Sequence, residues 1–577
     1  MCTSRDLMEG LSRALTISPE DVCLIGPDGT RRTWRELADD VRAWQNWLGS
    51  DANAGRTFAV RLDLSFNSIA LMVAAVTRPV RVAWLPLKLP AAREQEIVEN
   101  LGEDTLLVDE SSLAQALEGD MVTVAPEFVW DDHAKFIYFT SGSEGVPKAV
   151  QVGMSAIRNR IEWMWDDYAF RPSDRVVVQK PFSFVASYWE VLGTLLAGTT
   201  GILLTSAERS RPDRFFDRLA IDEATHLFAT PPAILGLCEI AAGQDAHLTS
   251  LRMVCSSADN LTGDVARKLF TTAPSARLFN LYGATETSAN TTIFEVPRHG
   301  AIPDQVPLGA PIRGTRIIVR DAHGDEVAFG QEGRICIQGV PVADGYLVNG
   351  RLTPGDDAFF TWADGVREMR TGDLGFVQED VLTLTGRLDN AVNVSGYKIH
   401  LEEIESAARR LAGSADQCGA VYHNDTKEEY LALVIPDTWE PLVTVARLGE
   451  VLPPYMVPQR IIPTPSVPRV RTGKVDRRGC LTLVTETARA TAEISPAHHE
   501  FYERVCALWA AALGEGLRES GDDFFSAGGD SLRAVRFITS IRKEFGVRVP
   551  LRGFYADPSI SFVVDLLTPA EEDHVED

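Results

Sequence analysis

The chain has 577 residues, of which 45% are hydrophobic, with 56 Lys plus Arg against 81 Asp plus Glu. This length suits roughly two to four domains, so a single small binding module is excluded. The net charge of −25 disfavours nucleic acid and anionic membranes as partners, and leaves small molecules and proteins.

The cysteines give no sign of a structural role. All eight are scattered, without CxxC pairs or clustered histidines, which argues against a metal site or a disulfide framework. A reducing cytoplasm is the expected location. The first residues, MCTSRDLMEGLSRALT, lack a signal-peptide core, and no stretch reaches the roughly 18 apolar residues of a membrane span.

From about residue 56 to 280, short β-rich runs alternate with helical patterns. Phe58–Leu64, Ile69–Val76 and Val80–Leu85 read as strand, helix and strand, and the alternation recurs over 175–204 and 227–255. A parallel, doubly wound sheet is therefore expected.

The pattern changes after Tyr282. Shorter β-like pieces with frequent glycine predict a β-rich subdomain, followed by mixed patterns over Leu401–Val484. Thr485–Ser495 is small, polar and weakly patterned, like a linker. Helical spacing then predicts a small bundle from Phe501, Val505, Leu508, Trp509, Ala512, Leu532, Val535, Ile538 and Ile541.

The segment Tyr138–Lys148, YFTSGSEGVPK, gathers hydroxyls, glycines and a lysine behind an apolar run. Such a loop can wrap phosphates through its backbone N–H groups. Its spacing does not match GxxxxGK[ST], so it is not a Walker A motif. Taken alone, it would be read as a polar surface turn.

Four further motifs follow in a fixed order: Asn280–Thr287 (NLYGATET), Arg370–Leu374 (RTGDL), Gly386–Asp389 (GRLD) and Arg471–Arg477 (RTGKVDR). With the glycine-rich loop, this set closely resembles the adenylation domains of nonribosomal peptide synthetases, within the adenylate-forming superfamily. The likeness runs from Thr33–Leu37 (TWREL) to Arg477, most of the chain. It implies two α/β subdomains, a β-rich subdomain and a mobile α+β C-terminal subdomain.

The resemblance implies attack of a carboxylate on the α-phosphate of ATP, with pyrophosphate leaving and Mg²⁺ offsetting the charge. Thr140–Ser143 would hold the β- and γ-phosphates, and Glu286 would ligate Mg²⁺. Tyr282 would stack on adenine, and Asp373 would accept the ribose hydroxyls. The full nucleotide set is Thr140, Ser141, Gly142, Ser143, Lys148, Asn280, Tyr282, Gly283, Thr285, Asp373 and Arg387.

Lys474 is the residue expected to serve adenylation, because a lysine in a glycine-flanked loop can reach the carboxylate and the α-phosphate as a mobile charge. The ordinary alternative is a solvated surface lysine. The resemblance also implies a rotation about Asp389 that moves Lys474 out and brings Val394–Lys398 (VSGYK) in for thioester formation.

Asp523–Leu532 (DFFSAGGDSL) resembles the attachment site of acyl or peptidyl carrier proteins, with Ser531 bearing 4′-phosphopantetheine. Ser531 also suits the N-cap of a helix, and both roles are compatible. The expected domains are an adenylation core (1–388), a C-terminal subdomain (389–484), a linker (485–495) and a four-helix-bundle carrier (496–570).

Four positions depart from the family pattern: Glu144, Ala149, Asn393 and His400. A carboxylate at 144 is unfavourable beside triphosphate unless it faces solvent or a cation. No HHxxxDG condensation or GxSxG thioesterase signature is found, so the product would pass in trans to a downstream synthetase or tailoring enzyme. A phosphopantetheinyl transferase is an implied partner, and an MbtH-like helper protein stays open.

The substrate pocket departs at Val185, in FVASYWE, where amino-acid-activating relatives carry an aspartate that pairs with the α-ammonium. A neutral acid lacking a charged α-amine is therefore expected, aryl acids ahead of α-keto or α-hydroxy acids. A β-amino acid is the alternative if a carboxylate lies elsewhere. The resemblance places around the pocket Phe184, Val185, Ala186, Trp189, Ala229, Val254, Ser256, Leu281, Ala289 and Asn290, none of them charged.

Two other functions remain open at this point. An acyl- or aryl-CoA ligase would pass its adenylate to free coenzyme A, which the carrier-like segment argues against. An inactive adenylate-binding scaffold is disfavoured because Glu286, Asp373, Lys474 and Ser531 occur together.

Overall fold

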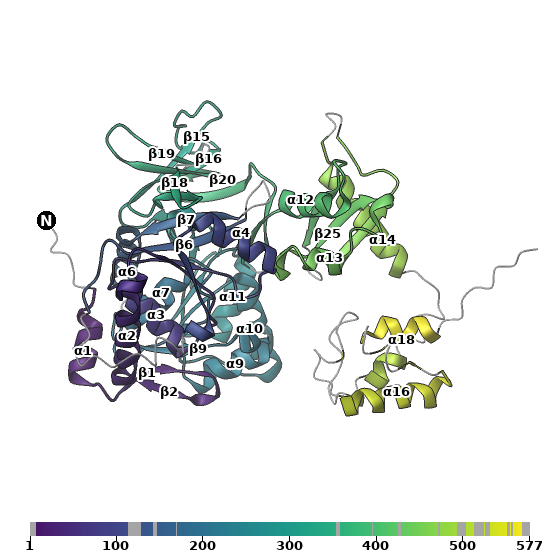
Figure 1. Ribbon diagram of the computed structural model, residues 1–577, viewed down its shortest axis with the longest axis horizontal. Coiled ribbons are helices and arrows are strands. Elements are labelled where there is room, and N and C mark those ends of the chain that lie inside the picture. Colours follow the sequence, from purple (N-terminus) through teal and green to yellow (C-terminus); the bar gives the residue numbers. More distant parts are fainter. Residues whose placement is uncertain are drawn as a thin grey trace, which may run out of the picture. The chain divides into compact units, whose positions relative to one another are not determined.

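The computed structural model forms two compact units, residues 1–477 and 478–577, which are described separately (Figure 1). The described residues are 7–112, 128–141, 147–168, 170–209, 211–353, 358–394, 396–424, 429–470, 474–492, 504–509, 511–512, 524, 531–547, 549–550, 554 and 558–567. No helix in these ranges is long and apolar enough to cross a membrane.

The first unit is built on a nine-stranded sheet in the order β14-β13-β12-β11-β10-β8-β9-β1-β2. Strands β8 to β12 pair in parallel, as expected for residues of about 56–280, whereas strands outside that range add the antiparallel pairs β1–β2, β12–β13 and β13–β14. The strands are β1 (Val22–Ile25), β2 (Arg31–Thr33), β8 (Arg175–Val178), β9 (Thr200–Leu203), β10 (His226–Ala229), β11 (Met253–Ser256), β12 (Arg277–Tyr282), β13 (Thr292–Val296) and β14 (Ala310–Pro311).

A second, seven-stranded sheet has the order β18-β17-β7-β6-β4-β3-β5, again with parallel pairs at β3, β4, β5 and β6. The strands are β3 (Thr57–Val60), β4 (Arg81–Trp84), β5 (Thr105–Val108), β6 (Lys135–Thr140), β7 (Lys148–Gly153), β17 (Gly345–Val348) and β18 (Arg351–Thr353).

Helices form three layers around these sheets. Buried residues of α2, α3, α6 and α7 share one core with both sheets, α9–α11 cover the far face of the nine-stranded sheet, and α4 covers the far face of the other. The helices are α1 (Glu9–Ile17), α2 (Trp34–Leu48), α3 (Phe66–Ala75), α4 (Ala91–Leu101), α6 (Met154–Tyr168), α7 (Ser187–Leu195), α8 (Ser206–Arg209), α9 (Pro212–Ile221), α10 (Pro231–Gln244) and α11 (Gly263–Thr272).

Helix α2 shows how the sequence sets these boundaries. The Thr33 side chain accepts a hydrogen bond from the backbone N–H of Glu36, and the Glu36 carboxylate accepts from the N–H of Thr33 at 2.8 Å. This capping box fixes the start of the helix. The apolar stripe that follows, with Trp34, Val41 and Trp44 buried, turns the helix toward the sheets.

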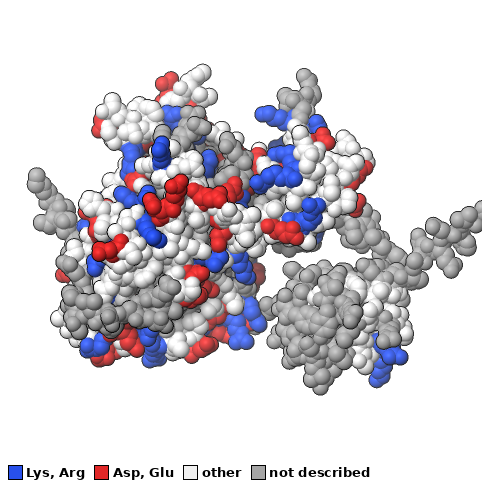
Figure 2. Space-filling view, in the orientation of Figure 1, with Lys and Arg blue, Asp and Glu red and all other residues white. Residues whose placement is uncertain are grey.

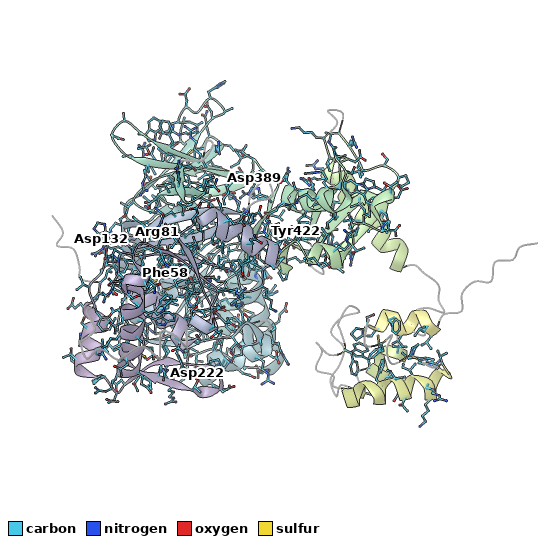
Figure 3. All side chains as sticks on the ribbon, in the orientation of Figure 1. Phe58, Arg81, Asp132, Asp222, Asp389 and Tyr422 are labelled. Carbon is cyan, nitrogen blue, oxygen red and sulfur yellow. The ribbon has the colours of Figure 1, made fainter. Side chains whose placement is uncertain are left out.

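The remainder of the first unit carries three smaller sheets. A five-stranded sheet contains β15 (Thr315–Arg320), β16 (Gly333–Gly339), β19 (Phe359–Thr361), β20 (Arg367–Gln378) and β21 (Val381–Arg387). The chain leaves it through Asp389 (Figure 3) and forms β22 (Ala391–Val394), β23 (Tyr397–His400), α12 (Leu401–Ala412), β24 (Gly419–Asn424), β25 (Glu429–Pro436), α13 (Val445–Gly449) and β26 (Arg460–Thr464). Figure 2 shows basic and acidic side chains interspersed over the viewed face of this unit.

The second unit has its own aromatic core. Trp509 is 1% exposed and meets Phe524, Phe537 and Phe554 edge-on. Its helices include α16 (Ser531–Phe545) and α18 (Ile560–Leu567). Phe501 lies outside the described residues.

One local expectation is wrong. Helix α14 (Arg477–Ala492) continues through most of the segment read as a linker. Thr485 and Thr487 satisfy their hydroxyls on carbonyls four residues earlier, and the interspersed alanines favour helix.

Candidate functional site

The proposed phosphate loop begins where β6 ends. Thr140 is paired with Lys148 across β6 and β7, and its hydroxyl is buried without a partner among the described residues. A buried hydroxyl left unpaired is costly, so it suits an oxyanion of a bound nucleotide. The Lys148 side chain is exposed, 5.2 Å from the Tyr346 ring centroid. Gly142, Ser143 and Glu144 lie outside the described residues.

Three predicted nucleotide-binding residues, Tyr282 on β12, Asp373 on β20 and Arg387 on β21, are joined by hydrogen bonds. The Tyr282 hydroxyl donates to Asp373 Oδ2 at 2.6 Å, and Arg387 donates to the other oxygen of the same carboxylate. Burial and the Asp373 charge raise the pKa of Tyr282 well above its usual value, so the phenol stays neutral. These three predicted nucleotide residues therefore meet in space.

Arg387 also connects this group to the expected pivot. Its guanidinium donates to both oxygens of Asp389, at 2.7 and 2.9 Å. Burial alone would raise the pKa of Asp389, but the Arg387 hydrogen bonds and charge lower it, so the carboxylate stays ionised. Asp389 is thus tied to Asp373 through a single arginine.

The residues on either side of Tyr282 are tightly packed. Asn280 donates to the carbonyl of Pro307 at 2.9 Å. A Cβ on Gly283 would lie 1.8 Å from the carbonyl oxygen of Ala289, so only glycine fits there. Thr285 opens the short 3₁₀ helix η3 (Thr285–Thr287), which lies beside β6 and β7.

Glu286 is the carboxylate expected to meet the metal. Its side chain is 6% exposed, and one oxygen accepts a hydrogen bond from Tyr346 at 3.1 Å. Among the described residues, no group of three or more His, Cys, Asp or Glu could hold a metal by itself. A single carboxylate at Glu286 suits a Mg²⁺ that takes most of its ligands from substrate phosphates and water.

The predicted acyl pocket is only partly gathered in one place. Trp189, Leu281 and Ala289 belong to the core between the two sheets, and Val185 and Ala186 pack against it. Asn290 is 5% exposed and accepts from Arg160 at 3.1 Å.

The packing separates Ala229, Val254 and Ser256 from the other residues predicted for the acyl pocket. The Val254 side chain belongs with Ala229 to the core on the opposite face of the nine-stranded sheet, because strand side chains alternate. Ser256, two residues on, shares that strand face. Met253 and Cys255 are the β11 residues that pack on the Trp189 side.

Arg160 was not predicted from the sequence. It lies on α6, is 1% exposed, and its guanidinium carbon is 4.8 Å from the Trp189 ring centroid. The only available signal was an arginine within the apolar helical run that includes Ile157, Ile161 and Met164.

The loop expected to replace Lys474 for thioester formation, Val394–Lys398, contacts Ser141 and Phe184. Ser141 Oγ donates to the carbonyl of Lys398 at 2.6 Å, and the Phe184 and Tyr397 ring centroids are 4.5 Å apart. A Cβ on Gly396 would lie 3.4 Å from the Thr230 methyl. The Lys474 side chain is exposed, in a turn closed by its own carbonyl and the N–H of Val470.

A buried ion pair holds the two parts of the first unit in this arrangement. Arg93 of α4 pairs with Glu403 of α12, and their side chains are 4% and 0% exposed. Tyr397 stacks on Tyr455 with ring centroids 3.8 Å apart, which stiffens the loop.

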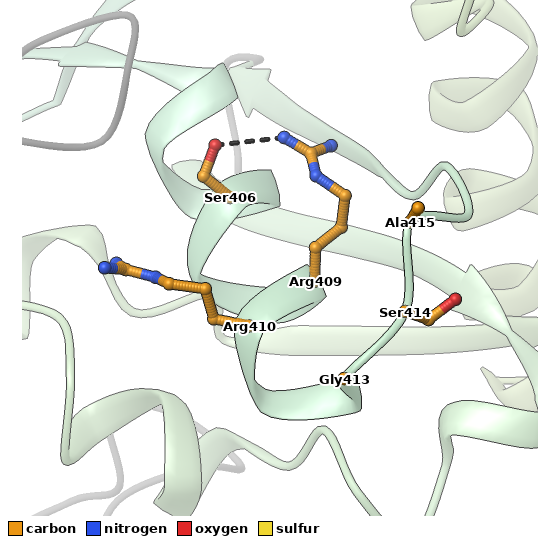
Figure 4. A pocket seen from close by; sticks show the side chains of 6 residues that line it. All are labelled: Ser406, Arg409, Arg410, Gly413, Ser414 and Ala415. Atoms are coloured by element: carbon orange, nitrogen blue, oxygen red, sulfur yellow. Dashed lines mark hydrogen bonds between the residues drawn. The ribbon is translucent and has the colours of Figure 1, made fainter.

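A pocket of about 420 Å³ lies at the C-terminal end of α12, lined by Ser406, Arg409, Arg410, Gly413, Ser414 and Ala415 (Figure 4). Arg409 donates to Ser406 at 2.9 Å there. None of the predicted site residues lines it.

These features define an adenylate-forming fold followed by a carrier-type unit. Residues 11–347 match the family model for AMP-binding enzymes, and residues 503–567 match the model for a phosphopantetheine attachment site. The chain therefore belongs to the AMP-binding enzyme family and carries a C-terminal phosphopantetheine attachment region.

Similar proteins include phenyloxazoline synthase MbtB of Mycobacterium sp. (strain MCS), 30% identical over 93% of this chain and 47% of the relative. Tyrocidine synthase 3 of Brevibacillus parabrevis is 29% identical over 84% of this chain and 7% of its own length. The chain thus spans half or less of these relatives. The solved structure of holo-PA1221, an NRPS protein containing adenylation and PCP domains, aligns with a TM-score of 0.74 at 24% identity, covering 98% and 96% of the two chains.

The Arg93–Glu403 pair gives a testable prediction. Arg93→Met leaves Glu403 buried without its counter-ion, and breaking a buried pair costs about 3–5 kcal/mol. The observed arrangement should lose population, so thioester formation should slow by about tenfold or more while pyrophosphate exchange is kept. Single-turnover loading and exchange assays measure the two steps.

Arg61→Met is the control. Arg61 pairs at 2.6 Å with Glu94, the neighbour of Arg93 on α4, and both residues of this pair precede the expected pivot at Asp389. This substitution should alter neither step. Equal losses in both steps for Arg93→Met would contradict the assigned role.

Proposed function

We propose that this chain uses ATP to adenylate a carboxylic acid and then transfers the acyl group, as a thioester, to its own C-terminal unit. The observation that carries the proposal is the order of two family matches in one chain, AMP-binding and then phosphopantetheine attachment. A ligase that passes its adenylate to free coenzyme A does not need a phosphopantetheine attachment region of its own.

The residues divide the first step between them. Thr140 and Ser141, at the end of β6, would bind the outer phosphates, while Asp373 would hold the ribose between Tyr282 and Arg387. Mg²⁺, bound at Glu286, would offset the charge of the triphosphate. Lys474 would enter to neutralise charge on the α-phosphate and the attacking carboxylate.

The second step would use the arrangement in which residues 396–398 lie at Ser141 and Phe184. With Lys474 displaced, the acyl carbon is open to a thiol from the side of the loop. 4′-Phosphopantetheine on Ser531 would supply that thiol, and AMP would leave as the thioester forms. Ser531 begins α16, and a helix N-terminus favours the phosphodiester charge.

The proposed substrate is an acid without a charged α-amine, with aryl acids first and α-keto or α-hydroxy acids next. Val185 offers no counter-charge where relatives place aspartate, and an unpaired ammonium is costly to bury. Trp189 gives an apolar wall that suits a flat ring. We propose a loading role, with a phosphopantetheinyl transferase and a downstream enzyme as partners.

Lys474→Ala should lower adenylation by roughly 10²–10³ but leave thioester formation from a supplied acyl-adenylate largely intact, because the charge acts in the first transition state. Pyrophosphate exchange and single-turnover loading measure these steps. Lys268→Ala, which removes an exposed lysine on α11, is the control. Equal losses in both steps would refute the role.

Ser531→Ala should leave pyrophosphate exchange unchanged and abolish covalent loading, since the variant lacks the attachment oxygen. Intact-protein mass is measured after treatment with a phosphopantetheinyl transferase. Continued gain of the phosphopantetheine mass would place the site elsewhere.

The substrate class is tested by pyrophosphate exchange with proteinogenic amino acids, benzoates, 2-oxo acids, 2-hydroxy acids and β-amino acids. Aryl acids should lead. Turnover of a standard α-amino acid above the best aryl, keto or hydroxy acid would reject the substrate class and leave the adenylation proposal standing. A leading β-amino acid would also reject it.

A further inference from the structure

Arg160 is a buried cation that forms no close ion pair within the described residues. Its guanidinium lies between two indole rings, 4.3 Å from the Trp163 centroid and 4.8 Å from that of Trp189. The carboxylate of Asp167, an exposed residue one turn or more further along α6, interacts with it only from beyond ion-pair distance. Charged side chains are almost never fully buried unless they are paired.

The hydrogen bonds of Arg160 are incomplete as well. Nη2 donates to Asn290 Oδ1 at 3.1 Å, but Nε and Nη1 are buried without partners among the described residues. Cation–π contacts stabilise a buried ion by less than its desolvation costs. An unseen acceptor would complete the site.

The neighbouring groups cannot supply the missing charge. Burial raises the pKa of Cys255 to about 12 and that of Tyr168 well above its usual value, so both are neutral. Glu190 is occupied: it accepts from the N–H groups of Gln179 and Lys180, both at 2.8 Å, and pairs with the Lys180 ammonium at 3.4 Å.

The position of Arg160 points to the acyl pocket. Outside its own helix it hydrogen-bonds to Asn290 and lies over the ring of Trp189, and the family resemblance assigns both residues to that pocket. The Trp189 indole N–H is also buried without a partner in the described part of the chain. The unpaired donors thus lie together at one wall.

We propose that Arg160 binds a second carboxylate of the substrate, remote from the one that is activated, so that the enzyme adenylates a dicarboxylic acid. This inference rests on the proposed function and narrows its substrate class. It agrees with Val185, which brings no negative charge to the pocket, so that the Arg160 cation would repel amines and attract anions.

The test compares matched acids in pyrophosphate exchange: benzoate with benzene-1,3- and benzene-1,4-dicarboxylate, pentanoate with glutarate, and 2-oxopentanoate with 2-oxoglutarate. The wild type should favour the diacid in at least one pair. Arg160→Met should lower kcat/KM for that diacid by roughly 10–100-fold, the value of one or two charged hydrogen bonds, and should spare the monoacid.

Arg158→Met is the matched control, since Arg158 lies on the same helix but stacks on Trp130 and faces Glu162. It should keep the diacid preference. Arg160→Lys, which retains the charge, covers the case in which Arg160→Met does not fold, and should keep part of the preference. Melting temperatures are measured for each variant with and without the diacid, whose stabilising shift should vanish in Arg160→Met.

Monoacid turnover without diacid preference in any pair would overturn this inference and leave the proposed function intact. So would equal loss of both acids in a folded Arg160→Met protein. Failure of every acid, amino acids included, to support exchange would instead reject the proposed function itself.

Discussion

The hydrogen bond from Ser141 to the carbonyl of Lys398 joins the end of β6 to the segment that follows the pivot. Through it, the same edge of the seven-stranded sheet that would hold phosphates also holds the loop proposed for thioester formation. The ring of Phe184 packs on that of Tyr397 in the same loop, and the buried Arg93–Glu403 ion pair joins α4 to α12. Because Lys474 is exposed in this arrangement, we propose that phosphate neutralisation by lysine and loop docking belong to different states of one site.

Electrostatics separate the nucleotide end of the site from the acyl end. At the nucleotide end, Asp373, Arg387 and Asp389 form a chain of alternating charges in which each ion has a partner. At the acyl end, Arg160 forms no close ion pair within the described residues, and two of its guanidinium nitrogens are buried without a hydrogen-bond partner there. A charge left unpaired inside a well-packed core indicates a ligand that brings the opposite charge.

The sequence predicted the fold class and the order of its elements because both depend on local patterns. Periodicity located β3, α3 and β4 within a few residues. It did not reveal the antiparallel edges, which depend on which strands meet, or the helix over 485–492, where threonine hydroxyls bond to the preceding turn. Motifs located Tyr282, Asp373 and Arg387 because each lies within a contiguous signature. Arg160 escaped because its role depends on α6 packing against Trp189 and Asn290, which no local pattern encodes.

The central claim, that one site alternates between two arrangements, is tested most directly by locking the observed one. Cysteines placed at 93 and 403 and bridged with a short, reducible bis-thiosulfonate linker would hold α4 against α12. Every native cysteine in the described ranges is buried except the half-buried Cys506, so single-cysteine variants provide a clean control. The account predicts that the locked protein loses pyrophosphate exchange, still loads acyl groups from a supplied acyl-adenylate, and regains exchange on reduction. Full pyrophosphate exchange by the locked protein would contradict it.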